Sequence, residues 1–240
     1  MHIAKQIIRQ IEKQIGDFEE IQKQIILCAS LLHDVGHGPF SHAFESITQD
    51  NHETRTIEII KSEETEINSI LKTFNPELPE KIVAFFDVNP DSQNSDVPVY
   101  TTQIVSSQLD ADRFDYLLRD SYATGTSYGN FDLQWMIQHL YVDEDRNRFY
   151  LSRKAYAVAE AYIFARYHMY RTVYIHKETR AAEVMLRLFF KRINQLKKDN
   201  KIDEKIPEEI HKVFSEKISL SAFLEFDDST IINLFKISQD

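Results

Sequence analysis

The sequence has little of the residue types that most often interrupt or cross-link a chain. Among 240 residues there are one cysteine, Cys28, five glycines and six prolines. A single cysteine excludes an intrachain disulfide and is typical of a protein from a reducing cytoplasm. Few glycines and prolines leave few breaks, which favours long helices joined by short connections.

Long hydrophobic runs are absent as well. The longest apolar stretch, residues 25–32, is far too short to cross a bilayer, and the N-terminus opens into an amphipathic repeat that does not resemble a signal peptide. A cytoplasmic protein without a membrane partner is therefore expected. The hydrophobic content of 42% is enough for a sizeable core, and one large domain is favoured over two small ones.

Positive charge is scarce. The chain carries 28 Lys and Arg against 38 Asp and Glu, a formal net charge of −10, which argues against broad nucleic-acid binding. A small basic pocket for a phosphate ligand stays compatible with this balance. The basic residues that cluster between Arg187 and Lys201 leave two interpretations open. They form either the solvated end of a helix or a contact for a polyanion or partner.

Hydrophobic spacing predicts a mainly α-helical chain. Isoleucines recur at helical intervals from Ile3 to Ile15, and Gly16-Asp17 ends that helix. Further helices are expected over residues 18–34, 41–46, 52–61, 64–74, 79–86, 101–122 and 133–140, and one or two long helices across 153–200. Residues 89–99 are expected to form a loop. One small β-hairpin is expected, with strands 141–143 and 148–151 around the turn 144–147.

The densest group of reactive side chains is the phrase HDVGHGPFSHAFE at residues 33–45. Three of the nine histidines fall here together with two carboxylates. The His33-Asp34 pair ends an apolar helix, and the following glycines let the chain turn back so that more imidazoles reach the same place. Such donors suit Mn, Fe, Ni, Zn or Mg. The alternative is that these histidines lie on the surface or cap helix ends.

A second cluster is LDADRFDYLLRD at residues 109–120. On a helix Asp112, Tyr116 and Asp120 share one face, with Arg113 beside them. This stripe could hold a metal at one end and a polar ligand along its length. The alternative is an exposed helix with Asp–Arg pairs.

A third cluster is RYHMYRTVYIHK at residues 166–177. Arg166, Tyr170 and Tyr174 share a helix face. Arginine clamps phosphate with directed hydrogen bonds, and tyrosine packs on a sugar or base. An aromatic core stripe with cations that reach solvent is the alternative.

Together these segments resemble the HD-domain superfamily, and specifically its deoxynucleotide triphosphohydrolase branch. The match is carried by LLHDVGHGPFSHAFE at 31–45, NHE at 51–53, LDADRFDYLLRD at 109–120 and RTVYIHK at 171–177. The resemblance implies an HD-domain helical core over residues 1–200, a helical extension over 201–240, and hydrolysis of a deoxynucleoside triphosphate (dNTP) to deoxynucleoside and triphosphate. It also implies a homo-oligomer.

The resemblance further implies roles for individual residues. Three are implied to be ligands of a divalent metal: His33, Asp34 and Asp112. Four are implied to act at or beside the reacting phosphate: His37, His42, Glu45 and His52. A histidine, with His42 as the first choice, is expected to protonate the leaving 5′-oxygen. Five are implied to hold the substrate, the arginines on phosphate and the others on deoxyribose: Arg113, Tyr116, Asp120, Arg166 and Tyr174. A Mg²⁺ ion on the substrate triphosphate is a further expectation.

The chain departs from the family pattern at its start. Family members carry a further metal-ligating histidine in a phrase like R-F-x-H-S-L-G just before the first helix, whereas this sequence begins inside that helix and His2 does not align with the ligand. Relatives also continue well beyond 240 residues, so the sequence is interpreted as a fragment or as the product of a late start codon. Two other functions stay open: hydrolysis of another nucleotide phosphoester, and a nucleotide-binding or assembly module without catalysis.

Overall fold

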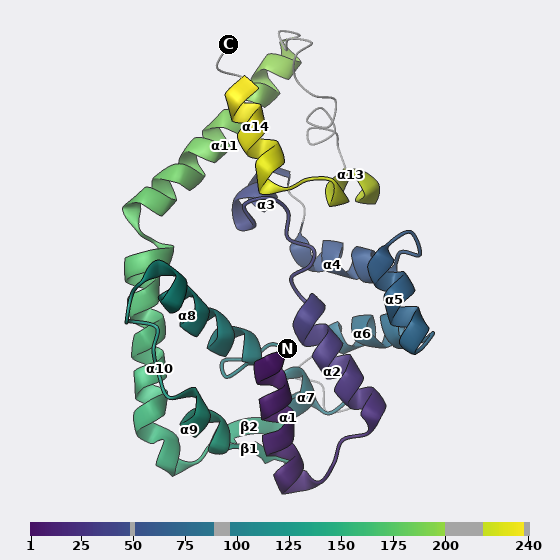
Figure 1. The fold of residues 1–240 in the computed structure, drawn as a ribbon, viewed down its shortest axis with the longest axis vertical. Helices are drawn as coiled ribbons and strands as arrows, with labels where there is room; N and C mark the ends of the chain where they lie inside the picture. The colour runs from purple at the N-terminus through teal and green to yellow at the C-terminus, as the bar shows by residue number, and fades with distance from the viewer. Residues whose placement is uncertain (49–50, 89–96, 200–217, 238–240) are drawn as a thin grey trace. The chain divides into compact units, whose positions relative to one another are not determined.

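The computed structural model describes residues 1–48, 51–88, 97–199 and 218–237 (Figure 1). These residues divide into two compact units. The first unit comprises residues 1–32 and 70–176, and the second comprises the described residues of 33–69 and 177–240. Both units are helical, and the described residues contain one two-stranded sheet. The predicted mainly α class is confirmed.

The first unit contains most of the N-terminal and central helices. Its elements are α1 (His2–Ile15), α2 (Glu20–Leu32), α6 (Leu78–Phe86), α7 (Val99–Thr102), α8 (Ala111–Thr124), α9 (Leu133–Gln138), β1 (Leu140–Asp143), β2 (Arg148–Leu151), η1 (Arg153–Ala155), α10 (Tyr156–Met169) and the π-helical turn η2 (Tyr170–Tyr174). Another helix, α5 (Glu66–Phe74), has residues in both units.

Helix α1 forms the centre of the first unit's core. Its isoleucines at positions 3, 7, 8 and 11 are buried, and the helix contacts α2, α8, α9 and β1. Each such side chain contributes roughly 1.5–3 kcal/mol on burial. Gly16 then adopts a φ of 93°, a conformation that favours glycine, and the helix ends there as predicted.

The predicted hairpin is confirmed. Strands β1 and β2 pair antiparallel with Leu140 opposite Leu151 and Asp143 opposite Arg148. Asn147 closes the turn with a φ of 51°, a left-handed conformation that asparagine tolerates better than most residues.

One predicted helix, residues 101–122, is wrong in its first half. Helix α7 ends at Thr102, and α8 begins only at Ala111. The physical reason is Asp110, whose buried carboxylate accepts hydrogen bonds from the backbone N–H groups of Arg113 at 2.7 Å and Ser107 at 2.8 Å. A side chain that caps the first turn of α8 in this way fixes a helix start.

The other helices predicted before residue 153 are present, with ends displaced by one or two residues. The stretch 153–200, expected to form one or two long helices, contains α10, η2 and α11 (Lys177–Lys198), with an interruption at Ile175-His176. Of the predicted loop, residues 89–96 lie outside the described residues, and Val97 and Pro98 are not helical.

The second unit is built around aromatic side chains. Besides α11 it contains α3 (His42–Thr48), α4 (His52–Lys61), α13 (Leu220–Leu224) and α14 (Asp228–Ile237). Phe44, Phe190 and Phe223 belong to one buried cluster, and α14 lies alongside α11 (Figure 1), where the ring centroids of Phe235 and Phe189 are 4.1 Å apart. The described part of the predicted extension, residues 218–237, therefore supplies core side chains. The domain boundary at residue 200 stays a prediction.

The basic segment singled out in the sequence starts on α11. There Arg187 Nη2 lies 3.9 Å from a Glu183 carboxylate oxygen, an ion pair between successive helical turns. Lys201 lies outside the described residues. Both interpretations of this segment therefore stay predictions.

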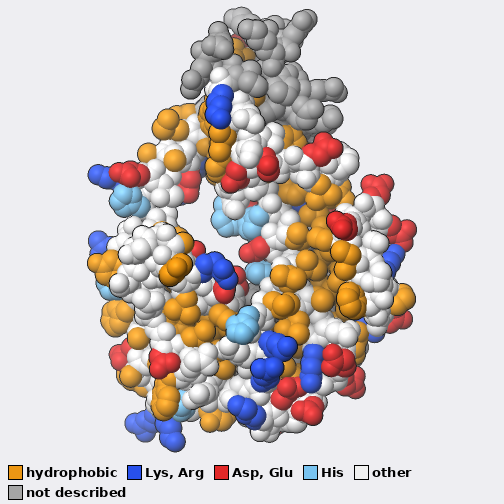
Figure 2. All heavy atoms as spheres, viewed as in Figure 1, with side chains coloured by type: hydrophobic (Ala, Val, Ile, Leu, Met, Phe, Trp, Pro, Cys, Tyr) orange, Lys and Arg blue, Asp and Glu red, His pale blue; other side chains and the backbone are white. Residues whose placement is uncertain are grey.

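Hydrophobic side chains of the first unit also reach the surface. Figure 2 shows them over α2, where Leu31 is 63% exposed. A cavity of about 460 Å³ lies between α2 and α6, with Ile25, Phe85 and Pro98 in its wall. Among the described helices, none has the length and hydrophobicity needed to cross a membrane.

Candidate active site

The His33-Asp34 pair follows the last residue of α2. The Nε2 atom of His33 lies 3.3 Å from Oδ2 of Asp34, so a nitrogen and an oxygen donor stand side by side. This donor set fits the divalent ions named above, because borderline cations accept both imidazole and carboxylate. The pair thus projects from the end of an apolar helix, as predicted.

Gly36 allows α4 to approach the chain segment between α2 and α3. A Cβ atom at this position would collide with the backbone oxygen of His52 and the backbone nitrogen of Thr56. The Gly36 N–H donates to Thr56 Oγ1 at 2.9 Å, and that hydroxyl donates to the His33 carbonyl at 3.0 Å. The first turn of α4 is therefore fixed against the segment that carries the histidines.

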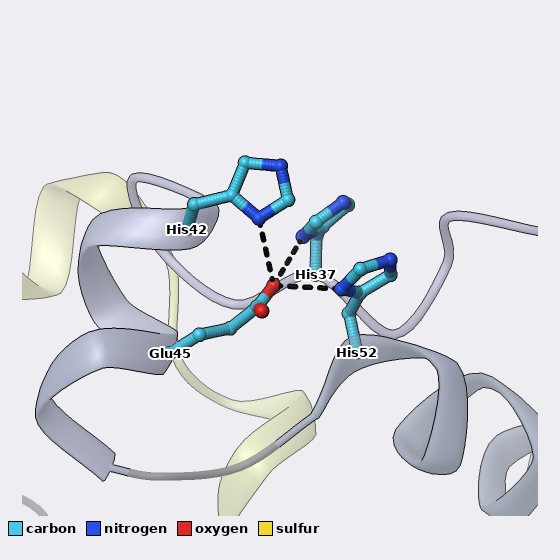
Figure 3. A group of neighbouring side chains, drawn as sticks. All are labelled: His37, His42, Glu45 and His52. Atoms are coloured by element: carbon cyan, nitrogen blue, oxygen red, sulfur yellow. Dashed lines mark ion pairs between the residues drawn. The ribbon is translucent and has the colours of Figure 1, made fainter.

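Four side chains meet at a single oxygen atom (Figure 3). Oε1 of Glu45 lies 2.9 Å from Nδ1 of His37, 2.9 Å from Nδ1 of His52 and 3.4 Å from Nδ1 of His42. His42 and Glu45 come from the first turn of α3, His52 begins α4, and His37 precedes both. One ligand atom from each lies within 4.8 Å of the others. We call these four residues the histidine cluster.

The atoms of His37, Glu45 and His52 that face one another are buried and lack well-formed hydrogen bonds. Nδ1 of His37, Nδ1 of His52 and Oε1 of Glu45 are close together, yet none of them has a hydrogen bond of acceptable geometry among the described residues. Buried polar atoms in this state are uncommon and call for a further partner, such as a cation, a water molecule or a phosphate oxygen. His42 differs, since its side chain is 77% exposed.

The electrostatics of the histidine cluster favour a neutral imidazole beside an ionised carboxylate. Burial lowers the pKa of His37, and the adjacent His52 lowers it further, against the opposite effect of Asp34 and Glu45. Burial by itself raises the pKa of Glu45, but the imidazoles of His52, His37 and His42 together lower it by more, so the net shift is downward. This combination can bind a cation or accept and donate protons at a phosphate.

Two predicted phosphate contacts converge in the first unit. Nη1 of Arg113 and Nη1 of Arg166 donate to the same side-chain oxygen of Gln108, at 3.2 and 3.0 Å. Nε of Arg113 also donates to Asp110 at 3.1 Å, and the Tyr162 hydroxyl donates to the Gln108 carbonyl at 2.8 Å. Two guanidinium groups around one oxygen are an arrangement that can bind a phosphate oxygen.

Gln108 and Asp110 were missed as site residues. Asp110 stands directly before the helical pattern of the second cluster, and an aspartate in that position is a recognisable capping signal. Gln108 carries no signal in the sequence, because an uncharged amide just before the motif has no distinctive spacing.

The predicted deoxyribose contacts also come together in the first unit. The Tyr174 hydroxyl donates to Oδ2 of Asp120 at 2.6 Å, and the ring centroids of Tyr116 and Tyr174 are 6.1 Å apart at nearly a right angle. Burial and then the hydrogen bond to Asp120 raise the pKa of Tyr174 far above its usual range, so its phenol stays a donor. A carboxylate held by a phenol beside an aromatic ring suits a sugar hydroxyl.

The predicted metal ligands are divided between the units. His33 and Asp34 belong to the second unit, whereas Asp112 is in the first turn of α8 in the first unit. That the three share one ion stays a prediction. His2 lies at the start of α1, where its Nε2 is 2.9 Å from the Gln6 amide nitrogen.

Comparison with known proteins gives a consistent assignment. The HD domain model matches residues 2–120, and the HD associated region matches residues 131–207. The chain is 34% identical to the uncharacterized protein YwfO of Bacillus subtilis, over 99% of this chain and 53% of that protein. It is 29% identical to the deoxynucleoside triphosphate triphosphohydrolase SAMHD1 homolog of Dictyostelium discoideum, over 82% of this chain and 39% of that protein.

A solved structure is similar over almost the whole chain. The phosphohydrolase from Bacteroides thetaiotaomicron superposes with a TM-score of 0.80 at 28% identity, covering 98% of this chain and 57% of that one. The chain therefore spans about half the length of these relatives, from 39% to 57%. With the histidine cluster inside the matched HD region and the associated region following it, the chain belongs to the HD-domain phosphohydrolase family.

Proposed function

We propose that the protein is a metal-dependent phosphohydrolase that converts a dNTP to a deoxynucleoside and inorganic triphosphate. The observation that carries the proposal is the histidine cluster, in which three imidazoles meet one carboxylate oxygen at 2.9–3.4 Å. The name of the Dictyostelium relative supports the substrate class. The Asp120–Tyr174 pair supports a substrate that carries a sugar hydroxyl.

We assign the metal to His33, Asp34 and Asp112. The 3.3 Å approach of His33 Nε2 to Asp34 Oδ2 supports the first two assignments. A divalent ion bound there would supply a water molecule with a pKa lowered from about 15.7 towards 7 and would polarise a phosphoryl oxygen.

The histidine cluster is assigned to the reacting phosphate. Hydrolysis would form a bond between a water oxygen and the α-phosphorus and break the bond from phosphorus to the 5′-oxygen. The attacking water would release its proton to solvent, and His42 would give a proton to the 5′-oxygen and take one back from solvent. His42 suits this role because it is the exposed member of the cluster, while Glu45 orients its ring from 3.4 Å. His37, kept neutral by burial, can donate a hydrogen bond to a phosphate oxygen.

The first unit is assigned to holding the rest of the substrate. Arg113 and Arg166 exchange the Gln108 oxygen for phosphate oxygens, where their positive charge counters the charge that develops during the reaction. Asp120 accepts a hydrogen bond from the 3′-hydroxyl, and Tyr116 packs on the sugar. Mg²⁺ on the triphosphate would offset its charge of about −4.

The product identifies the reaction. The chain is incubated with each dNTP and Mn²⁺ or Mg²⁺ in ¹⁸O-labelled water, and the products are analysed by mass spectrometry. We expect intact triphosphate carrying the label and an unlabelled deoxynucleoside, because water attacks phosphorus. Orthophosphate as the only inorganic product would favour another nucleotide phosphoester as substrate. Metal-loaded protein without turnover would reject the proposal in favour of a binding module.

The metal assignment has a matched control on the same helix. Asp112→Asn should abolish both bound metal, measured by elemental analysis, and triphosphate release. Asp115→Asn should preserve both, because Asp115 is engaged by Arg119 at 2.8 Å one helical turn later. Wild-type metal content and rate in Asp112→Asn would show that Asp112 is not a ligand.

A further inference from the structure

The chain segment between His37 and His42 has a backbone conformation that residues with side chains rarely adopt. Phe40 and Ser41 have φ angles of 55° and 49°, so two consecutive residues with side chains occupy the left-handed region. Residues other than glycine rarely adopt it, and they keep it only where their surroundings hold them. Because this segment joins two members of the histidine cluster, whatever holds it also sets their positions.

Part of the support is local, because the Ser41 N–H donates to the Gly38 carbonyl at 2.9 Å and the Ala43 N–H donates to the Phe40 carbonyl at 3.1 Å. Further support comes from residues that follow those matched by the family models. Those matches end at residue 207, whereas the Phe40 N–H donates to Oδ1 of Asp228 at 2.9 Å. Asp228 is the first residue of α14, which packs in the core of the second unit. A charged acceptor on an anchored helix thus holds the middle of the strained segment.

Phe223 of α13 supports the same segment from a second direction. A Cβ atom at Gly38 would lie 2.6 Å from the Phe44 ring and 3.3 Å from the Phe223 ring, so the chain passes closely between these aromatic side chains. Phe223 is in turn fixed by Arg55, whose guanidinium carbon lies 4.9 Å above its ring.

Arg55 links this support to the start of α4. It is only 2% exposed, and its Nη2 donates to the Ile218 carbonyl at 3.1 Å. It lies one turn after His52, so residues 218–228 contact both the segment that bears His37 and His42 and the helix that bears His52.

We propose that Asp228 is a positioning residue for the histidine cluster and acts through the Phe40 amide. Among the described residues, the hydrogen bond of its carboxylate is to the Phe40 amide and not to a side chain of the cluster. An effect of Asp228 on hydrolysis rests on the proposed function. Its hydrogen bond to the Phe40 amide does not depend on that function. Phe223 and Arg55 support the same chain segment by packing, Phe223 against Gly38 and Arg55 over the Phe223 ring.

The test uses neighbouring aspartates that begin the same helix. Asp227 accepts from the Thr230 N–H at 2.7 Å and so caps α14, whereas Asp228 accepts from Phe40. The variants Asp228→Ala, Asp228→Asn and Asp227→Ala are compared in the full chain. Hydrogen–deuterium exchange at residues 38–42 measures the hold on the segment, and steady-state kinetics with a dNTP separate kcat from KM.

We expect Asp228→Ala to speed exchange of the Phe40 amide about 10-fold and to lower kcat about 10-fold with little change in KM, because cluster geometry and not substrate affinity is lost. Asp228→Asn keeps an oxygen acceptor and should restore both values. Asp227→Ala should lower the melting temperature and leave exchange and kcat near wild type.

Two results would overturn the proposal. One is wild-type exchange at Phe40 in Asp228→Ala. The other is an equal effect of Asp227→Ala, which would show that general anchoring of α14 is what matters. If the wild-type chain releases no triphosphate, the proposed function fails, but exchange at Phe40 and the NMR shifts of the cluster's imidazole rings still decide the role of Asp228.

Discussion

The two groups of candidate site residues differ in how their polar atoms are satisfied. In the second unit, the buried nitrogens of His37 and His52 and the oxygen of Glu45 lie close together without well-formed hydrogen bonds. In the first unit, the corresponding groups have partners, such as the Tyr174 hydroxyl on Asp120 at 2.6 Å and both arginines on Gln108.

This difference suggests a division of labour. Three imidazoles that lie 2.9–3.4 Å from one carboxylate oxygen can bind a cation or exchange protons. The histidine cluster is therefore suited to chemistry on a phosphate. A network that is already hydrogen-bonded keeps its shape before the ligand arrives and is suited to recognition.

The largest effect is expected at Glu45. Glu45→Gln removes the negative charge of the carboxylate that lies beside all three imidazoles. We expect kcat to fall about 10²–10⁴-fold, which is the usual range for a lost acid–base group, and KM to change little. His139→Gln is the matched control, because that imidazole bonds to the Trp135 carbonyl at 3.0 Å outside the cluster. A kcat within twofold of wild type in Glu45→Gln would show that Glu45 takes no part in the chemical step.

A smaller effect with the opposite kinetic signature is expected at Asp120. In the proposed function Asp120→Asn would weaken a charged hydrogen bond to the sugar, so we expect KM to rise about 10–100-fold while kcat changes little. Tyr174→Phe should have part of the same effect, and the double variant should be less than additive because the two groups form one pair. A fall in kcat at constant KM would instead assign Asp120 to the chemical step.

Local signals in the sequence were sufficient for much of this arrangement. The 3.6-residue spacing of isoleucines located α1, the turn residues located the hairpin, and HDVGHG located a helix end followed by a tight return. The meeting of His37, His42, Glu45 and His52 could be anticipated because all four lie within 16 residues of one another.

Long-range contacts could not be predicted in this way. Gln108 meets an arginine 58 residues later, and Phe40 meets an aspartate 188 residues later. No spacing rule connects such positions, because the fold and not the helical period brings them together. The break before α8 was missed for a different reason, since the helical pattern of residues 101–122 outweighed the capping signal of Asp110.

The smallest effect is expected at Tyr162. A variant at this position tests whether substrate affinity depends on Gln108 or on the Asp120–Tyr174 pair. Tyr162→Phe removes only the hydroxyl that donates to the Gln108 carbonyl at 2.8 Å, because the ring keeps its contacts with Phe114 and Phe131. Burial raises the pKa of Tyr162 to about 12, so the hydroxyl is a donor throughout the assay range.

We expect Tyr162→Phe to lose about 1 kcal/mol of unfolding free energy, measured by urea denaturation, and to raise KM less than about threefold. The effect on KM should be small because the substitution leaves Arg113 and Arg166 unchanged, together with their hydrogen bonds to the Gln108 side chain before substrate binds. A rise in KM as large as that of Asp120→Asn would mean that Gln108 sets the geometry of the arginines. Recognition in the first unit would then depend on a hydrogen-bond network centred on Gln108 more than on the sugar-binding pair.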